Sequence, residues 1–307
     1  GGTEGGGDDL VIEDGIRIEV LSSQPARMRG DEARIRVTPA PGGEVADLRV
    51  DIDGADVTDQ LTPTDGALEG VVAGFVEGTS TVRARAASAP DDAAVQRVRA
   101  WPRTGPMISG PQVPLLACST VEHGLGEPTD ANCSAPPTVT WRYVTTDRRV
   151  VDLADPATVP ADAATVQVET ADGDHTGPFV LRHERGVVNR SVYDIVTLHR
   201  AGTATSPGAA DAGDPSGTDL AAATAWSGRL VYRFGGGCAA TYGQGRSLTE
   251  VEDLSLLEQG HAVATATFNT GAVQCNDVVS AETTMMVKER VIEALGVPTA
   301  TIGEGAS

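Results

Sequence analysis

The chain has 307 residues, 40% of them apolar, which is enough for two domains with separate hydrophobic cores. Its 43 acidic and 23 basic residues give a net charge of −20, so we expect no nucleic-acid partner and no binding to an anionic membrane surface. No apolar run approaches the ~20 residues that a membrane-spanning helix needs, so we also expect no membrane span.

The first 14 residues are predicted to be a flexible, processed N-terminus. They begin Gly1-Gly-Thr-Glu-Gly-Gly-Gly-Asp-Asp, a composition typical of flexible linkers. A secreted protein whose signal peptide has been removed would begin in this way, and so would an expression scar.

Residues 15–102 show short alternating segments separated by turns. Apolar and polar residues alternate over residues 16–20, 33–37 and 48–52, and Asp53-Gly54 is a hairpin signal. Six or seven short strands in about 90 residues, without helical periodicity, predict an immunoglobulin-like β-sandwich. We expect the arginine and aspartate residues of these strands on their solvent faces, and no catalytic set among them.

Residues 103–307 are predicted to form a second domain, which a proline-rich linker over residues 102–114 introduces. Residues 201–225 are rich in Ala, Gly, Ser, Pro and Asp and are expected to be a low-complexity loop. The first strands expected in this domain lie around residues 141–144, 179–183 and 192–198, the last two pairing around Arg185-Gly186.

The pattern then changes to strand–helix–strand–helix–strand. Its segments are residues 229–234, 248–259, 262–268, 280–295 and 299–302. Strands that alternate with helices favour a parallel sheet with right-handed crossovers. The predicted fold class is therefore multi-domain: an immunoglobulin-like β-sandwich followed by the first half of an α/β-hydrolase fold, which ends at a nucleophile elbow.

The four cysteines, Cys118, Cys133, Cys238 and Cys275, are expected to form disulfides. They include no Cys-x-x-Cys motif and no Cys/His spacing typical of zinc, so no metal site is predicted. Three pairings are possible; the sequential one is favoured because Cys118–Cys133 closes a short loop, which is worth roughly 3 kcal/mol. Disulfides indicate an extracytoplasmic protein, either secreted or at the cell surface.

The last five residues, Gly303-Glu304-Gly305-Ala306-Ser307, match the first half of a Gly-x-Ser-x-Gly nucleophile elbow. In that motif a tight strand-to-helix turn presents the serine hydroxyl at the top of a sheet, and glycines avoid clashes in the turn. A flexible chain end is the alternative interpretation. The hypothesis makes Ser307 a catalytic nucleophile.

A glycine loop directly follows the strand at residues 229–234. Gly235, Gly236 and Gly237 can direct backbone N–H groups at a developing negative charge, as the oxyanion loop of lipase-like hydrolases does. The alternatives are a tight turn or a phosphate cradle, and no Gly-Lys-Ser/Thr motif supports the cradle. Asp277 and Glu304 are candidate lining residues of the same site.

The general base is missing from this candidate site. In such hydrolases the acid and then the histidine follow the serine along the chain, so both are expected beyond residue 307. All five histidines precede Ser307 and are predicted to be structural or on the surface: His123, His175, His183, His199 and His261. No cofactor is predicted.

Five segments carry a family resemblance: residues 104–111, 189–195, 226–238, 276–289 and 301–307. Through them, residues 105–307 resemble an uncharacterised family of large secreted bacterial α/β-hydrolase-like proteins, akin to tannase/feruloyl esterase and hydroxybutyrate-oligomer hydrolases. In these relatives the last segment continues with two glycines and a long C-terminal half. The resemblance implies Ser307 as nucleophile and the glycine loop as its oxyanion neighbour, and it implies no particular substrate.

Together these observations predict the N-terminal portion of a secreted serine hydrolase of the esterase type, acting on a small ester or a polyester-like substrate. Its partner would be the C-terminal remainder of the same protein, because a sheet that stops at its central strand leaves an unpaired edge. The alternative is a non-catalytic extracellular structural or assembly protein with a hydrolase-like scaffold.

Overall fold

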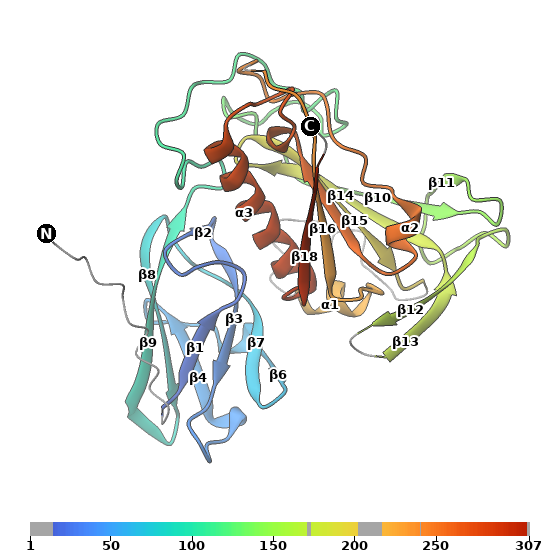
Figure 1. Ribbon diagram of the computed structural model, residues 1–307. Helices are drawn as coiled ribbons and strands as arrows, with labels where there is room; N and C mark the ends of the chain where they lie inside the picture. Colours follow the sequence, from blue (N-terminus) through green and yellow to red (C-terminus); the bar gives the residue numbers. More distant parts are fainter. Residues whose placement is uncertain (1–14, 171–172, 202–216, 240, 306–307) are drawn as a thin grey trace, which may run out of the picture.

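The first of two β-rich regions is a two-layered sandwich (Figure 1). The structure, a computed structural model, describes residues 15–170, 173–201, 217–239 and 241–305. One layer is a four-stranded sheet in the order β1-β3-β7-β6, and the other is a five-stranded sheet in the order β2-β9-β8-β4-β5. The strands are β1 (Arg17–Val20), β2 (Met28–Arg29), β3 (Glu32–Thr38), β4 (Leu48–Ile52), β5 (Ala55–Asp56), β6 (Thr62–Thr64), β7 (Ala67–Ala73), β8 (Gly78–Ala86) and β9 (Ala89–Trp101).

The two layers enclose one hydrophobic core. Ile35 on β3, Val50 on β4 and Val82 on β8 are buried in it. Alternate residues point outward, as the period of two in a strand requires. On the outer face of the five-stranded sheet, Arg85 of β8 pairs with Asp51 of β4 at 2.9 Å.

The second region is built on a seven-stranded mixed sheet in the order β11-β10-β14-β15-β17-β16-β18, with a separate β12-β13 hairpin. β16 runs parallel to both β17 and β18, and the other pairs in the sheet are antiparallel. The strands are β10 (Thr138–Val144), β11 (Val150–Leu153), β12 (Thr165–Thr170), β13 (Gly173–Pro178), β14 (Val180–Val188), β15 (Ser191–His199), β16 (Arg229–Phe234), β17 (Ala262–Ala266) and β18 (Ala300–Gly305).

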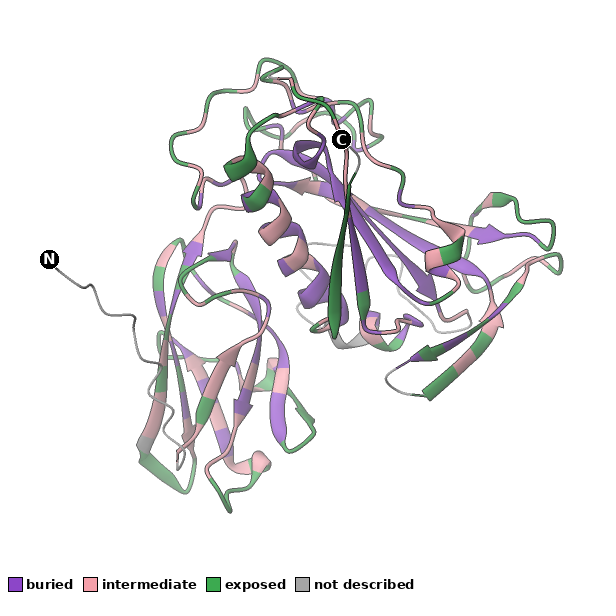
Figure 2. Cartoon of the chain, viewed as in Figure 1, coloured by how far each residue is buried: buried purple, intermediate pink, exposed green. Residues whose placement is uncertain are grey.

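Helices cover the two faces of this sheet unequally. The helices are α1 (Gly217–Ala222), α2 (Leu254–Leu257) and α3 (Asp277–Leu295). α3 packs Met286 and Val291 against Leu230 of β16, whereas the other face is covered by Val251 and Leu257 from α2 and the segment before it. Figure 2 shows the central strands buried and β18, at the sheet edge, exposed along its length.

The predicted fold class, an immunoglobulin-like β-sandwich followed by the first half of an α/β-hydrolase fold, is wrong. Strands predominate throughout the described residues, in four sheets, and the largest sheet is antiparallel over most of its width. The strand–helix alternation accounts only for β16, β17 and β18. β15 pairs antiparallel with β17, so the hairpin strands of residues 138–199 extend the same sheet and make it mixed.

Two local features also differ from the prediction. The apolar spacing of residues 248–259 predicted a helix, but only residues 254–257 are helical, and Val251 packs in the core from the segment before that helix. The β14–β15 hairpin turns at Asn189 and Arg190, where φ is +49° and +61°, while Gly186 lies inside the ladder opposite Tyr193. Apolar periodicity alone does not separate short buried strands from short helices.

Arg29 on β2 joins the sandwich to α3, and its side chain is 3% exposed. Its backbone N–H donates to Glu289 Oε1 at 3.1 Å, and its Nε donates to the carbonyl of Met286 at 3.0 Å. Its Nη2 donates to Glu293. One guanidinium therefore serves two buried carboxyl groups, and burial raises the pKa of both, that of Glu293 to about 7.

Glu282 fastens the linker between the two regions to α3. Its buried carboxylate accepts hydrogen bonds from the N–H groups of Met107 and Ser109, each at 2.8 Å, and from the N–H of Ile108. The Ser109 hydroxyl donates to the second carboxylate oxygen at 2.9 Å. The proline-rich linker is therefore bound along the helix surface.

Glu293 is expected to make stability depend on pH. Its pKa rises from 4.5 to about 7 on folding, so its contribution is fully present below the unfolded value and is lost as the pH rises through the folded one. Glu293→Gln stays neutral and keeps an oxygen acceptor for Arg29. We expect this variant to match the wild type at about pH 4 and to be more stable by roughly 3 kcal/mol at about pH 8.5.

Urea unfolding at these two pH values measures the difference. Glu77→Gln is the matched control, because Glu77 is exposed and should leave the pH dependence as it is. Equal pH dependence in Glu293→Gln and the wild type would show that folding does not raise the pKa of Glu293.

Glu282→Ala is expected to release the linker, because three N–H groups lose their acceptor at a cost of about 1–3 kcal/mol. Amide hydrogen exchange at Met107, Ile108 and Ser109 should become faster by at least an order of magnitude. Glu282→Gln keeps one acceptor oxygen and should retain most of the protection. Unchanged exchange in the alanine variant would refute this role.

Candidate pocket at the carboxyl ends of β16 and β17

An open pocket of about 410 Å³ lies where β16 and β17 end and α3 begins. The glycine loop after β16 forms one side of it, and the segment between β17 and α3 forms the other. Its lining residues are Phe234, Gly235, Gly236, Gly237, Asn269, Gly271, Gln274, Cys275, Asn276, Asp277 and Ser280.

The glycine loop continues the parallel pairing of β16 with β17. The Gly235 N–H donates to the carbonyl of Asn269, and the Gly271 N–H donates back to the carbonyl of Gly235, both at 3.0 Å. A Cβ on Gly235 would lie 2.8 Å from the Thr270 side chain, and Gly237 has a φ of +90°, so both positions require glycine. The loop is therefore held close against residues 269–272.

This pairing decides which N–H groups remain for a ligand. The Gly235 N–H already donates to the carbonyl of Asn269, so it is not available to a ligand. At most two of the three predicted N–H donors of the loop remain. Within the described residues, the N–H groups of Gly236 and Gly237 make no hydrogen bond. These two line the pocket as available donors.

The N-terminus of α3 forms the adjoining wall. The helix begins at Asp277 rather than at the predicted residue 280, and Asn276 caps it, because its Oδ1 accepts from the N–H groups of Val278 and Val279 at 3.1 Å. A helix N-terminus carries a partial positive charge that favours anions. Asp277, one of the two candidate lining residues, lies at this pocket.

Asn269 is a polar wall residue that no sequence motif indicated. Its amide donates to the Ser280 carbonyl at 2.8 Å and to Thr284 Oγ1 at 2.9 Å, and its oxygen accepts from the Tyr232 hydroxyl at 2.6 Å. Gln274 was missed as well. Only the fold brings both side chains to the glycine loop.

Glu304 does not line the pocket. Its carboxylate pairs with Arg233 at 2.9 Å, and Arg233 also pairs with Asp253 at 2.7 Å. The backbone of β18 nevertheless ends at the pocket, since Gly305 is paired with Phe234. Ser307, the predicted nucleophile, lies outside the described residues.

A disulfide anchors the glycine loop to the start of α3. Cys238 follows the loop and is bonded to Cys275, which directly precedes the cap residue Asn276. The two walls of the pocket are therefore joined covalently at its base.

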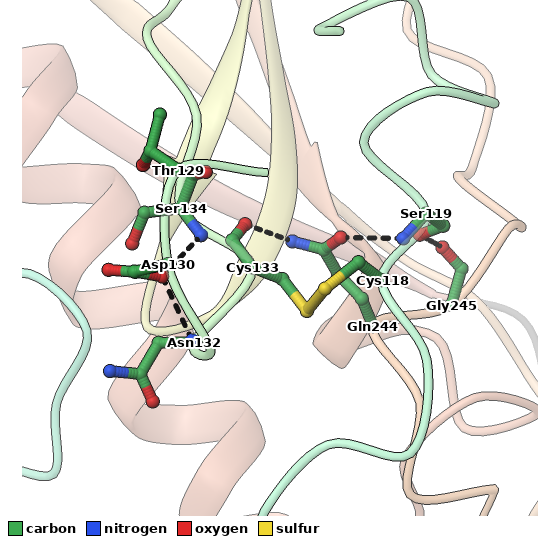
Figure 3. Close-up of a disulfide and its surroundings, with 9 residues drawn as sticks. All are labelled: Cys118, Ser119, Thr129, Asp130, Asn132, Cys133, Ser134, Gln244 and Gly245. Atoms are coloured by element: carbon green, nitrogen blue, oxygen red, sulfur yellow. Dashed lines mark hydrogen bonds between the residues drawn. A yellow bond between two sulfur atoms is a disulfide. The ribbon is translucent and has the colours of Figure 1, made fainter. Parts of the chain in front are cut away.

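The second disulfide, Cys118–Cys133, holds a surface loop against the same region (Figure 3). The buried amide of Gln244 donates to the Cys133 carbonyl and accepts from the Ser119 N–H, both at 2.9 Å. The segment that follows the glycine loop is thereby bound to the loop of residues 118–133. Both pairings are the sequential ones.

None of the five histidines lines the pocket. Burial lowers the pKa of His183, but its contacts with Asp194 and Glu252, at 3.2 and 3.4 Å, outweigh this and raise it. Burial lowers the pKa of His199 to about 4. His183 lies on β14 and His199 on β15, away from the pocket, where they act as structural residues.

Among the described residues, no group of His, Cys, Asp and Glu side chains is arranged to hold a metal ion. Within the same ranges, the helices are all too short or too polar to span a membrane.

The sequence matches a known protein family. Residues 18–307 match the family described as "Tannase-like family of unknown function (DUF6351)". No curated protein matches the sequence. The family match spans the sandwich, the mixed sheet and all pocket residues. The chain therefore belongs to this tannase-like family.

Proposed function

We propose that the protein is an esterase-type serine hydrolase and that the pocket beside residues 235–237 binds the ester. The observation that carries this proposal is the pair of unengaged N–H groups, of Gly236 and Gly237, in an open pocket next to the N-terminus of α3. Membership of a tannase-like family supports it.

The chemistry follows from where negative charge develops. In acyl transfer, a serine hydroxyl attacks the ester carbonyl carbon while a general base takes its proton, and the carbonyl electron pair moves to oxygen as a tetrahedral intermediate forms. Donors aimed at that oxygen stabilise it, and the positive end of α3 adds to their field. Collapse of the intermediate expels the alcohol, whose oxygen receives the proton from the base, and water then hydrolyses the acyl-enzyme.

In this proposal Ser307 is the nucleophile. β18 ends beside the glycine loop through the pairing of Gly305 with Phe234, two residues before Ser307. The general base and its acid come from outside the described residues, and we propose the part of the protein beyond residue 307 as their source. The proposed domains are residues 15–102, which contain the sandwich, and residues 103–307, which contain the mixed sheet.

The proposed location is extracytoplasmic, secreted or at the cell surface. Two disulfides support it, because such bonds persist in oxidising compartments. The acidic surface charge is compatible with a soluble extracellular enzyme that acts on a small ester or a polyester-like substrate.

A fluorophosphonate probe tests the nucleophile. We expect the native, full-length protein to be labelled at Ser307, as mapped by peptide mass spectrometry, and Ser307→Ala to remain unlabelled. Labelling requires an activated serine. If the folded native protein stays unlabelled, the non-catalytic structural or assembly role is favoured instead.

The oxyanion role is tested at Gly236, whose φ is not positive. Gly236→Pro removes one N–H donor and should slow ester hydrolysis and probe labelling by about 100-fold, the usual effect of losing one such donor. Gly236→Ala keeps the N–H and is the matched control. Equal rates in the two variants would exclude this donor from the mechanism.

A further inference from the structure

A second cavity, of about 170 Å³, lies between the sandwich, the linker and the mixed sheet. It is separate from the pocket at the glycine loop, because the two share no lining residue. Its walls come from β2, residues 103–104, residues 134–137, β14, β15 and α3.

Three arginines from three separate elements meet at this cavity: Arg29 on β2, Arg103 in the linker and Arg290 on α3. Each is positioned by carboxylates that do not line the cavity. Arg290 binds Glu184 through Nε at 2.8 Å and Nη2 at 3.2 Å. Arg103 Nη2 donates to Asp31 at 2.7 Å and to Glu32 at 3.1 Å.

These contacts leave donors unused. Arg29 uses its Nε and Nη2 for Met286 and Glu293. In the described part of the chain, the Nη1 of Arg29, of Arg103 and of Arg290 makes no hydrogen bond. Three guanidinium groups, each with a spare N–H₂, therefore surround one small space.

The remaining walls are mostly apolar. They consist of Ala135, Pro136, Pro137, Val187 and Val188, with hydroxyl groups from Thr104, Ser134 and Tyr193. Among the residues that the structure describes, no acidic side chain lines the cavity. An occupant would therefore contact both guanidinium groups and hydrocarbon.

Acidic groups lie behind each of the three arginines. Glu289 and Glu293 share Arg29, and burial raises the pKa of both, which favours their neutral forms. Glu184 stays ionised, because Arg290 and Arg182 outweigh its burial and lower its pKa. Asp31 and Glu32 face Arg103 from the sandwich.

We propose that this cavity binds a small carboxylate anion with a compact apolar body. The spare N–H₂ groups of different arginines can donate charge-assisted hydrogen bonds to the two carboxylate oxygens, and the proline and valine walls accept the hydrocarbon part. Because Arg29 belongs to the sandwich and Arg290 to α3, the ligand would also bridge the two regions. This site is independent of the proposed esterase activity.

Isothermal titration calorimetry of the full chain with benzoate tests the proposal, with acetate and sulfate as comparison anions at matched ionic strength. We expect one saturable site, with benzoate bound more tightly than acetate or sulfate. Arg103→Gln, at the most exposed of the three arginines, should weaken benzoate binding at least tenfold.

Two further variants separate loss of the site from loss of folding. Ala135→Leu fills the cavity without changing a charge and should also lose binding. Arg246→Gln removes an exposed arginine that pairs with Glu122 away from the cavity, and its affinity should equal that of the wild type. Absence of a saturable site, sulfate bound as tightly as benzoate, or unchanged affinity in a folded Arg103→Gln would each overturn the proposal.

Discussion

The buried contact between Arg29 and the carboxyl groups of α3 is the interaction on which the arrangement of the described chain depends. Through Glu289 and Glu293, α3 holds the sandwich, and through Glu282 it holds the linker. Through Arg290 it is bound to the mixed sheet, and its N-terminus forms one wall of the pocket at the glycine loop. A single helix therefore positions both regions and the candidate site.

Polar contacts of this kind specify an arrangement more than they stabilise it. Taking Arg29 and two carboxyl groups out of water is costly, and their mutual attraction largely offsets that cost only when the geometry is good. A shifted α3 would leave buried carboxyl groups or N–H groups without partners, at about 1–3 kcal/mol each. We infer that the register of α3 against β2 and the linker is set by this requirement.

The candidate site combines local and long-range constraints. Residues 235 and 237 need to be glycine because Thr270 and Ala272 lie against them, and that contact arises from the pairing that continues from β16 and β17. The same pairing engages the N–H of Gly235 and leaves those of Gly236 and Gly237. The arginine-lined cavity has no sequence signature, since Arg29, Arg103 and Arg290 lie far apart in the chain.

The sequence by itself determined the alternating strands of the N-terminal sandwich, the glycine loop, the sequential disulfides and the long helix, because each depends on neighbouring residues or on a periodic pattern. Only the tertiary structure decided that β15 joins β17 in a mixed sheet, that residues 248–253 are not helical, and that Glu304 pairs with Arg233 instead of lining the pocket. These outcomes depend on partners distant in sequence. Strand pairing and ion pairing depend on which donors and acceptors are buried together, and a local sequence pattern does not identify those partners.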